Sequence, residues 1–242
     1  MLNKNSFFFL AFLWFASPVF AANQIVVVKI SGAINPTVSQ FVSQEIHQAN
    51  EEQQALIILN MDTPGGLDTS MRQIIKEIQN SYVPVASFVS PSGSRAASAG
   101  TFITIASHIA AMAPGTNIGA AHPVNMMGSN NEQETTLEKK VVNDAAAYIR
   151  SLAELRNRNS HWAELAVVKS VSISAEEAKR LHVIDLIAKN VESLALAIDG
   201  RKIQTASGPM TLKTAGLEIV YHKMSPRLKM LDIISNPDVA YV

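Results

Sequence analysis

Three runs of β-branched and aliphatic residues, separated by amphipathic segments, limit the folds open to this chain of 242 residues. The runs cover 24–30, 55–61 and 83–89, and each is almost continuously apolar. Strands of this kind are buried on both faces, as in parallel sheets covered by helices. The segments at 35–46 and 70–80 repeat apolar residues at helical spacing. The pattern predicts an α/β fold with βαβ units and a mainly parallel sheet.

The remainder of the chain predicts a short helix at about 98–107, a short strand at 108–112 and outlying helices. One outlying helix begins at the capping box Ser174-Ala-Glu-Glu177, and another covers 191–198. The segment 201–212 predicts a hairpin that turns at Gly208-Pro209. The longest helix is expected at about 134–156, with a buried stripe of Leu137, Val141, Ala145, Tyr148 and Leu152.

The first residues indicate export. Lys4 precedes an apolar run at 7–15, and small residues follow at Val19 and Ala21. This order is typical of a secretory signal peptide cleaved after Ala21. An uncleaved anchor is the alternative, although the run is short for a membrane span of about 20 residues. We therefore expect a signal peptide at 1–21, one domain at 22–235 and a short tail at 236–242. The protein is expected in the periplasm or at the outer face of the cytoplasmic membrane.

Composition excludes several classes of protein. The formal net charge is zero, 17% of residues are charged and no basic stripe is present, so nucleic-acid binding is not expected. The chain has no cysteine, which excludes disulfides, cysteine nucleophiles and cysteine-ligated metals. The histidines lack metal-ligand spacing and there is no glycine-rich phosphate loop, so neither a metal nor a cofactor is expected.

Two segments of small and turn-forming residues follow predicted strands. They are Asp62-Thr-Pro-Gly-Gly66 and Ser92-Gly-Ser-Arg-Ala-Ala-Ser98-Ala-Gly100. Because the working atoms of parallel α/β sheets sit at the carboxyl ends of the strands, the two segments are expected to meet at one edge. Gly65 and Gly66 allow backbone N–H groups to face a ligand, as an oxyanion hole requires. A tight turn without function is the other interpretation of this pair.

Ser98 is the candidate nucleophile. At the start of a helix its neighbours' N–H groups are free and the dipole favours negative charge, so the N–H of Ala99 is a second candidate oxyanion donor. Serine is also a common helix N-cap, which is the alternative reading. Ser92, Ser94 and Ser107 are competitors that the local pattern does not exclude.

A serine nucleophile needs a base. His122 and Lys140 are the candidates, and a lysine can serve when burial leaves it partly neutral. Lys139 is adjacent to Lys140 in the predicted long helix, and periodicity does not decide between them. A solvated surface lysine is the ordinary reading for either.

Four motifs resemble one family. Asp62-Thr-Pro-Gly-Gly-Leu67, Ala97-Ser-Ala-Gly-Thr101, Asn117-Ile-Gly-Ala-Ala-His-Pro-Val124 and Lys140-Val-Val-Asn-Asp-Ala-Ala-Ala-Tyr-Ile-Arg150 are similar to the N-terminal protease domain of NfeD proteins. These are membrane-associated serine proteases of the ClpP/crotonase-like fold, and the resemblance covers 24–241. It implies a Ser98–Lys140 dyad, with oxyanion N–H groups from Gly66 and Ala99.

The resemblance leaves a second base open. In the related ClpP peptidases a histidine follows the serine by about 25 residues, and His122 lies in that place. ClpP also uses an aspartate, whose place here holds Ser170. A histidine without its orienting carboxylate is a poor base, which favours the lysine dyad. His122 is then expected to line the substrate cleft.

The family resemblance implies an exported serine endopeptidase that cleaves hydrophobic segments of stomatin-like membrane proteins. Gly65, Leu67, Met126 and Met127 are candidate substrate-binding residues, the two methionines from a loop expected at 123–133. A homodimer or larger ring is also implied. Two other functions remain open: a catalytically weak scaffold for a stomatin-like partner, and a crotonase-like enzyme acting on acyl-CoA thioesters, which export argues against.

Overall fold

The computed structural model describes residues 23–123 and 132–234. The predicted signal peptide, the short tail, and the loop residues Met126 and Met127 lie outside these residues. Within them, no helix is long and apolar enough to cross a membrane.

The centre of the molecule is a six-stranded sheet in the order β11-β1-β2-β3-β5-β8. Every neighbouring pair in this sheet is parallel. The mainly parallel α/β fold predicted from the apolar runs is thereby confirmed. The strands are β1 (Ile25–Ser31), β2 (Leu56–Asp62), β3 (Val85–Val89), β5 (Ile109–Met112), β8 (Leu186–Ile187) and β11 (Ile219–His222).

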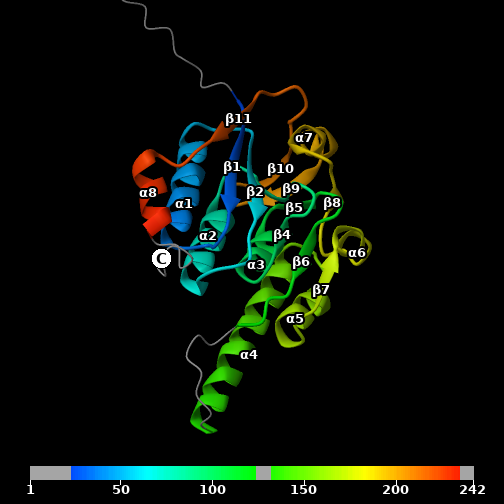
Figure 1. Cartoon of the computed structure of the whole chain (residues 1–242). Coiled ribbons are helices and arrows are strands. Elements are labelled where there is room, and N and C mark those ends of the chain that lie inside the picture. Colours follow the sequence, from blue (N-terminus) through cyan, green and yellow to red (C-terminus); the bar gives the residue numbers. More distant parts are fainter. Residues whose placement is uncertain (1–22, 124–131, 235–242) are drawn as a thin grey trace, which may run out of the picture.

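The strands β1, β2 and β3 bury most residues of both faces, but against different partners. Val26 and Val28 of β1 pack with α1 (Pro36–Glu51), α2 (Asp68–Asn80) and α3 (Ala99–Ala106) on one side. Ile25 and Val27 pack with α7 (Val191–Ile198) on the other. Alternate residues of a strand point to opposite faces, so a continuous apolar run fills two cores. Figure 1 shows the sheet between these helices.

A second, three-stranded sheet joins β4 (Arg95–Ala96), β6 (Asn117–Gly119) and β7 (Ser172–Ser174). It leads into α6 (Ala175–Arg180), which begins at Ser174 with the predicted capping box. The other elements are α5 (Ser160–Val168), the hairpin of β9 (Lys202–Thr205) and β10 (Gly208–Thr211), and α8 (Pro226–Ile234), which packs on α1.

The hairpin turns two residues earlier than predicted, at Ala206-Ser207. Pro209 lies within β10 opposite Gln204, and β10 has only one neighbour. A proline is tolerated in an edge strand, where its missing N–H leaves no ladder bond unmade. The prediction of a turn at Gly208-Pro209 treated this proline as a breaker and was wrong.

The long helix α4 (Glu132–Leu155) is buried only over its second half. Ala145 and Leu152 are buried as predicted, but Leu137 and Val141 are 60% and 41% exposed. Figure 1 shows the reason: the first turns of α4 project beyond the body, where no other element covers them. The predicted apolar stripe is therefore correct only where α4 packs against α3 and α5.

A buried histidine lies at the amino end of β5. The Val85 N–H donates to Nδ1 of His108 over 3.1 Å, and the ring is 7% exposed. Burial is the main cause that lowers the pKa of His108 from 6.5 to about 3, and the positive charges of Arg156 and Arg158 are smaller causes of the same shift. The folded protein therefore holds this ring neutral.

A neutral buried histidine makes stability depend on pH. Because the pKa of His108 is lower in the folded state, its contribution to stability is present above pH 6.5 and is lost as pH falls towards 3. We expect His108→Asn, whose side-chain oxygen can still accept the Val85 N–H, to flatten the curve by about 1.4 kcal/mol per pH unit between pH 6 and 4. Urea unfolding at several pH values measures this difference. Parallel curves for the two proteins would contradict it.

Candidate active site

The two small-residue segments meet beside the carboxyl ends of β2 and β3. The Thr63 N–H donates to the Arg95 carbonyl over 2.8 Å, and the Ala97 N–H donates to the Thr63 carbonyl over 3.1 Å. These two bonds form an isolated parallel bridge between Thr63 and Ala96. The turn after β2 and the entry to α3 are therefore fixed against each other.

Ser98 has an unusual backbone conformation at the start of α3. Its φ of 49° and ψ of −117° lie outside the regions that residues with a side chain normally adopt. Its N–H donates to the Ala120 carbonyl over 2.7 Å, which helps to hold this conformation. Ser98 occupies the N-cap position, but its side chain makes no capping bond. Strain of this kind at a strand-to-helix turn is typical of exposed nucleophiles.

Gly65 provides the space that the Ser98 side chain occupies. A Cβ atom on Gly65 would lie 2.5 Å from Cβ of Ser98 and 3.0 Å from its Oγ. Gly65 also has a φ of +119°, which favours glycine. Gly66 lies close to the segment that contains Ile34, since a Cβ on Gly66 would lie 2.1 Å from the Ile34 carbonyl oxygen. The serine side chain is thus in close contact with the glycine turn.

Backbone hydrogen bonds distinguish the N–H groups around Ser98. Gly65 donates to Thr63 Oγ1 and Leu67 donates to the Ile34 carbonyl, so both are satisfied. In α3, Gly100 donates to the Ala97 carbonyl. The N–H groups of Gly66 and Ala99 have no acceptor among residues 23–123 and 132–234. They come from the two segments that meet at Ser98.

The competing serines are placed differently. Ser107 is at the far end of α3, where its hydroxyl donates to the Ile103 carbonyl over 2.8 Å. Ser94 is buried, and Ser92 is exposed in the turn before β4. None of the three combines exposure with the strained backbone of Ser98.

His122 is half-buried and lies two residues after Ala120, whose carbonyl accepts the Ser98 N–H. Its Nδ1 lies 2.8 Å from the Val167 carbonyl oxygen. Because a carbonyl only accepts, Nδ1 carries a proton, and in the neutral ring Nε2 then keeps its lone pair. A backbone carbonyl thus orients this ring, a partner that sequence reasoning missed when it searched for a carboxylate.

Lys139 and Lys140 are both exposed on α4. Among the described residues, no hydrogen bond joins the Ser98 hydroxyl to Lys140 or to His122. Catalytic bonds are often unmade in unliganded proteins, so this does not remove either candidate. Leu67, beside the glycine turn, is 49% exposed and open to a ligand.

One arginine connects the elements around the site, and sequence reasoning missed it. Arg72 of α2 bonds Asp68 in its own helix and Asp144 of α4. Its guanidinium also lies 4.4 Å from the ring centroid of Tyr148, which stacks on Phe102 of α3. The i,i+4 spacing of Asp68 and Arg72 was the available signal, but the partners on α4 depend on tertiary structure. Asp144 is one turn after Lys140, so Arg72 fixes the position of that part of α4.

No group of three or more histidine, aspartate and glutamate side chains is placed to hold a metal ion in the described parts of the chain. The chemistry open to this arrangement is that of a hydroxyl nucleophile beside unpaired backbone donors.

Comparison with known sequences gives two relatives. The chain is 36% identical to the membrane-bound protease PH1510 of Pyrococcus horikoshii over 232 residues, which are 95% of this chain and 52% of that protein. It is 31% identical to the membrane protein NfeD1b of Bacillus subtilis over 110 residues, which are 46% of this chain and 24% of that protein. The chain thus spans about half the length of PH1510.

Comparison with solved structures gives the same relative. A lysine-to-alanine mutant of the 1510-N membrane-bound stomatin-specific protease, in complex with a substrate peptide, matches with a TM-score of 0.79 and 34% identity over 88% of this chain and 98% of that one. A serine-to-alanine mutant matches with a TM-score of 0.77 and 34% identity over 84% and 99% of the two chains. The predicted ClpP/crotonase-like fold is confirmed. The family model for the NfeD1b N-terminal domain matches residues 24–203, and the chain therefore belongs to this family.

Proposed function

We propose that this protein is a serine endopeptidase with Ser98 as its nucleophile. The observation that supports this most directly is the close approach of the Ser98 side chain to Gly65, in segments whose Gly66 and Ala99 N–H groups have no acceptor among the described residues. A serine hydroxyl at this point can attack a carbonyl whose oxygen turns towards both donors. A helix N-cap or a plain turn would need none of these features.

In the proposed reaction, Lys140 takes the proton of the Ser98 hydroxyl as its oxygen attacks the scissile carbonyl. The N–H groups of Gly66 and Ala99 stabilise the oxyanion of the tetrahedral intermediate. Lys140 then returns the proton to the leaving amine as the C–N bond breaks, which leaves an ester on Ser98. Attack by water on this ester releases the carboxylate product and restores the serine.

Lys140 is the preferred base for two reasons. The relative whose complex holds a substrate peptide is a lysine-to-alanine mutant, and another is a serine-to-alanine mutant. In this chain, Arg72 holds the turn of α4 that follows Lys140 against α2, close to the glycine turn from which α2 begins. His122 is the alternative base, with Nε2 open, and otherwise a residue of the cleft.

A lysine base needs shelter from water, yet Lys140 is exposed in the single chain. Exposed Leu137 and Val141 flank it on the projecting part of α4. We propose that a second copy of the chain covers this surface, so that the active form is a homodimer or a larger ring.

The proposed substrates are hydrophobic segments of stomatin-like membrane proteins, since the matched Pyrococcus protease is stomatin-specific. Exposed Leu67, beside Gly65 and Gly66, offers an apolar contact for such a segment. Met126 and Met127 are proposed as further contacts. The predicted signal peptide at 1–21 supports an activity outside the cytoplasm, in the periplasm or at the outer face of the cytoplasmic membrane.

Removal of the nucleophile distinguishes a serine endopeptidase from a catalytically weak scaffold. We expect Ser98→Ala to lower cleavage of hydrophobic peptides by at least about a thousandfold, because no other described hydroxyl lies between the free N–H groups. Ser92→Ala, an exposed serine of the same segment, is the control and retains cleavage. Product formation followed by mass spectrometry measures both. Equal cleavage by Ser98→Ala and the parent protein would favour a scaffold for a stomatin-like partner.

The choice of base has its own test. Lys140→Met is expected to abolish cleavage, whereas Lys139→Met, one residue away on the same exposed turn, retains it. His122→Ala is expected to change KM more than kcat, because a cleft residue contacts substrate without moving its proton. Steady-state kinetics separate these effects. Loss of kcat in His122→Ala with survival of Lys140→Met would establish a ClpP-like serine–histidine peptidase instead.

The contact between Gly65 and Ser98 gives a third test. Gly65→Ala places a methyl group 2.5 Å from Cβ of Ser98, so we expect it to displace the serine and abolish cleavage. Gly93→Ala is the matched control, since Gly93 also has a positive φ, of 90°, but nothing lies within 4 Å of its added Cβ. Both variants should lose about 1 kcal/mol of stability from backbone strain. Similar kcat/KM values for the two variants would show that the contact has no catalytic role.

A further inference from the structure

A recess of about 410 Å³ lies at the amino end of β5, between α4 and the β9–β10 hairpin. Its lining includes His108, Arg156, Asp185, Arg201 and Lys202. Ser98 begins α3, and this recess adjoins the other end of the same helix, since Arg156 Nε donates to the Ala106 carbonyl over 2.9 Å. The recess is therefore separate from the candidate active site.

Positive charge exceeds negative charge in this recess. Asp185 is already paired with Arg158, with 2.6 Å between Oδ2 and the guanidinium. Arg156, Arg201 and Lys202 have no carboxylate partner in the described ranges. Burial is the main cause that lowers the pKa of Arg156 to about 10, and repulsion from Arg158 is the smaller cause. Three cations thus line the hollow, and among the described residues its one lining carboxylate, Asp185, is paired with Arg158.

An unpaired donor accompanies these cations. His108 is neutral and accepts the Val85 N–H at Nδ1, so its proton is on Nε2. That Nε2 is buried and has no hydrogen-bond partner among the described residues. A buried donor without an acceptor is unfavourable, and an acceptor bound in the recess would satisfy it.

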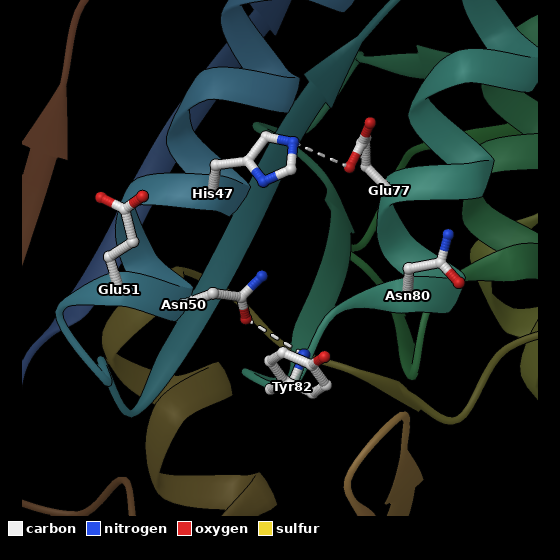
Figure 2. Close-up of a pocket in the computed structure, with 6 residues that line it drawn as sticks. All are labelled: His47, Asn50, Glu51, Glu77, Asn80 and Tyr82. Carbon is white, nitrogen blue, oxygen red and sulfur yellow. Dashed lines mark hydrogen bonds and ion pairs between the residues drawn. The ribbon is translucent and has the colours of Figure 1, made fainter.

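A second recess in the described part of the chain lacks this combination of unpaired cations and an unpaired donor. This hollow, of about 430 Å³, lies between the ends of α1 and α2, and Figure 2 shows six residues that line it. There, His47 pairs with Glu77 over 3.2 Å, and Asn50 Oδ1 accepts the Tyr82 N–H over 3.0 Å. Among the described residues, no buried unpaired side-chain donor lines that hollow.

We propose that the recess beside His108 binds a small multivalent oxyanion, either free phosphate or a phosphomonoester head group. Guanidinium groups present paired N–H donors that match phosphate oxygens, and Arg156 and Arg201 would supply them. The Nε2–H of His108 would donate to a further oxygen. A dianion offsets three unpaired cations better than a monovalent carboxylate does, which favours phosphate.

Capping of α3 does not account for all of these groups. Arg158 Nη1 donates to the Ile105 and Ser107 carbonyls, and Arg156 donates to that of Ala106, so two arginines already satisfy the helix end. Arg201 and Lys202 contribute nothing to that cap. Their positions on the hairpin, facing the same hollow, are explained by a bound anion.

Calorimetric titration of the full chain with sodium phosphate tests the proposal. We expect saturable binding of one phosphate per chain, weakened at least tenfold in Arg201→Gln, because a charge-assisted hydrogen bond is worth about 1.5–3 kcal/mol. Arg201 has no side-chain partner in the described ranges, so this variant should fold. Arg227→Gln removes the same charge from exposed α8 and is expected to bind as the parent does. A phosphate-dependent shift of the His108 ring signals in NMR would place the anion beside Nε2.

Three further titrations, with chloride, acetate and glycerol phosphate, complete the test. Sodium chloride at equal ionic strength should give no saturable signal, and sodium acetate should bind at least tenfold more weakly than phosphate. Glycerol phosphate is compared with inorganic phosphate, and the tighter of the two identifies the source of the oxyanion. Absence of saturable binding by either phosphate compound, equal weakening in Arg227→Gln, or acetate binding as tight as phosphate would each overturn the proposal. Peptidase activity does not enter this test, so the proposed function can fail independently.

Discussion

The close approach of two backbone segments is the constraint on which the candidate site depends. The turn after β2 and the entry to α3 come so near that a Cβ on Gly65 would overlap Ser98. A Cβ on Gly100 would lie 2.6 Å from the Thr63 side chain, so the same approach requires glycine on both segments. The N–H groups of Gly66 and Ala99, one from each segment, have no acceptor among the described residues.

The local sequence predicted the parts of the molecule that are set by local chemistry. The apolar runs predicted β1, β2 and β3, and the capping box predicted the start of α6, because each signal lies within a few residues. The predictions failed where the environment of a residue depends on parts of the chain that are distant in sequence. Leu137 and Val141 have helical spacing, but nothing in the described chain packs against their part of α4. The carbonyl that orients His122 comes from Val167, and no pattern in the sequence indicates a backbone acceptor 45 residues away.

The choice between the two adjacent lysines of α4 depends on more than the local sequence pattern. Periodicity did not separate Lys139 from Lys140, and both are exposed on α4. The resemblance to a family selected Lys140, and the structure adds Arg72, whose bond to Asp144 fixes the following turn. Because α4 projects before Asp144, its exposed part is where the proposed second copy would shelter Lys140. Under that proposal, a base sheltered only in an assembly would leave the single chain inactive.

The two ends of α3 carry opposite chemistry, and this follows from one physical property of helices. At the amino end the unpaired N–H of Ala99 favours developing negative charge beside Ser98. At the carboxyl end the last carbonyls attract cations, and Arg156 and Arg158 supply them. Burial is the main cause of the lowered pKa of Arg156, and repulsion from the nearby guanidinium of Arg158 adds to it. An anion beside Arg201 would relieve that repulsion and fix the carboxyl end of α3.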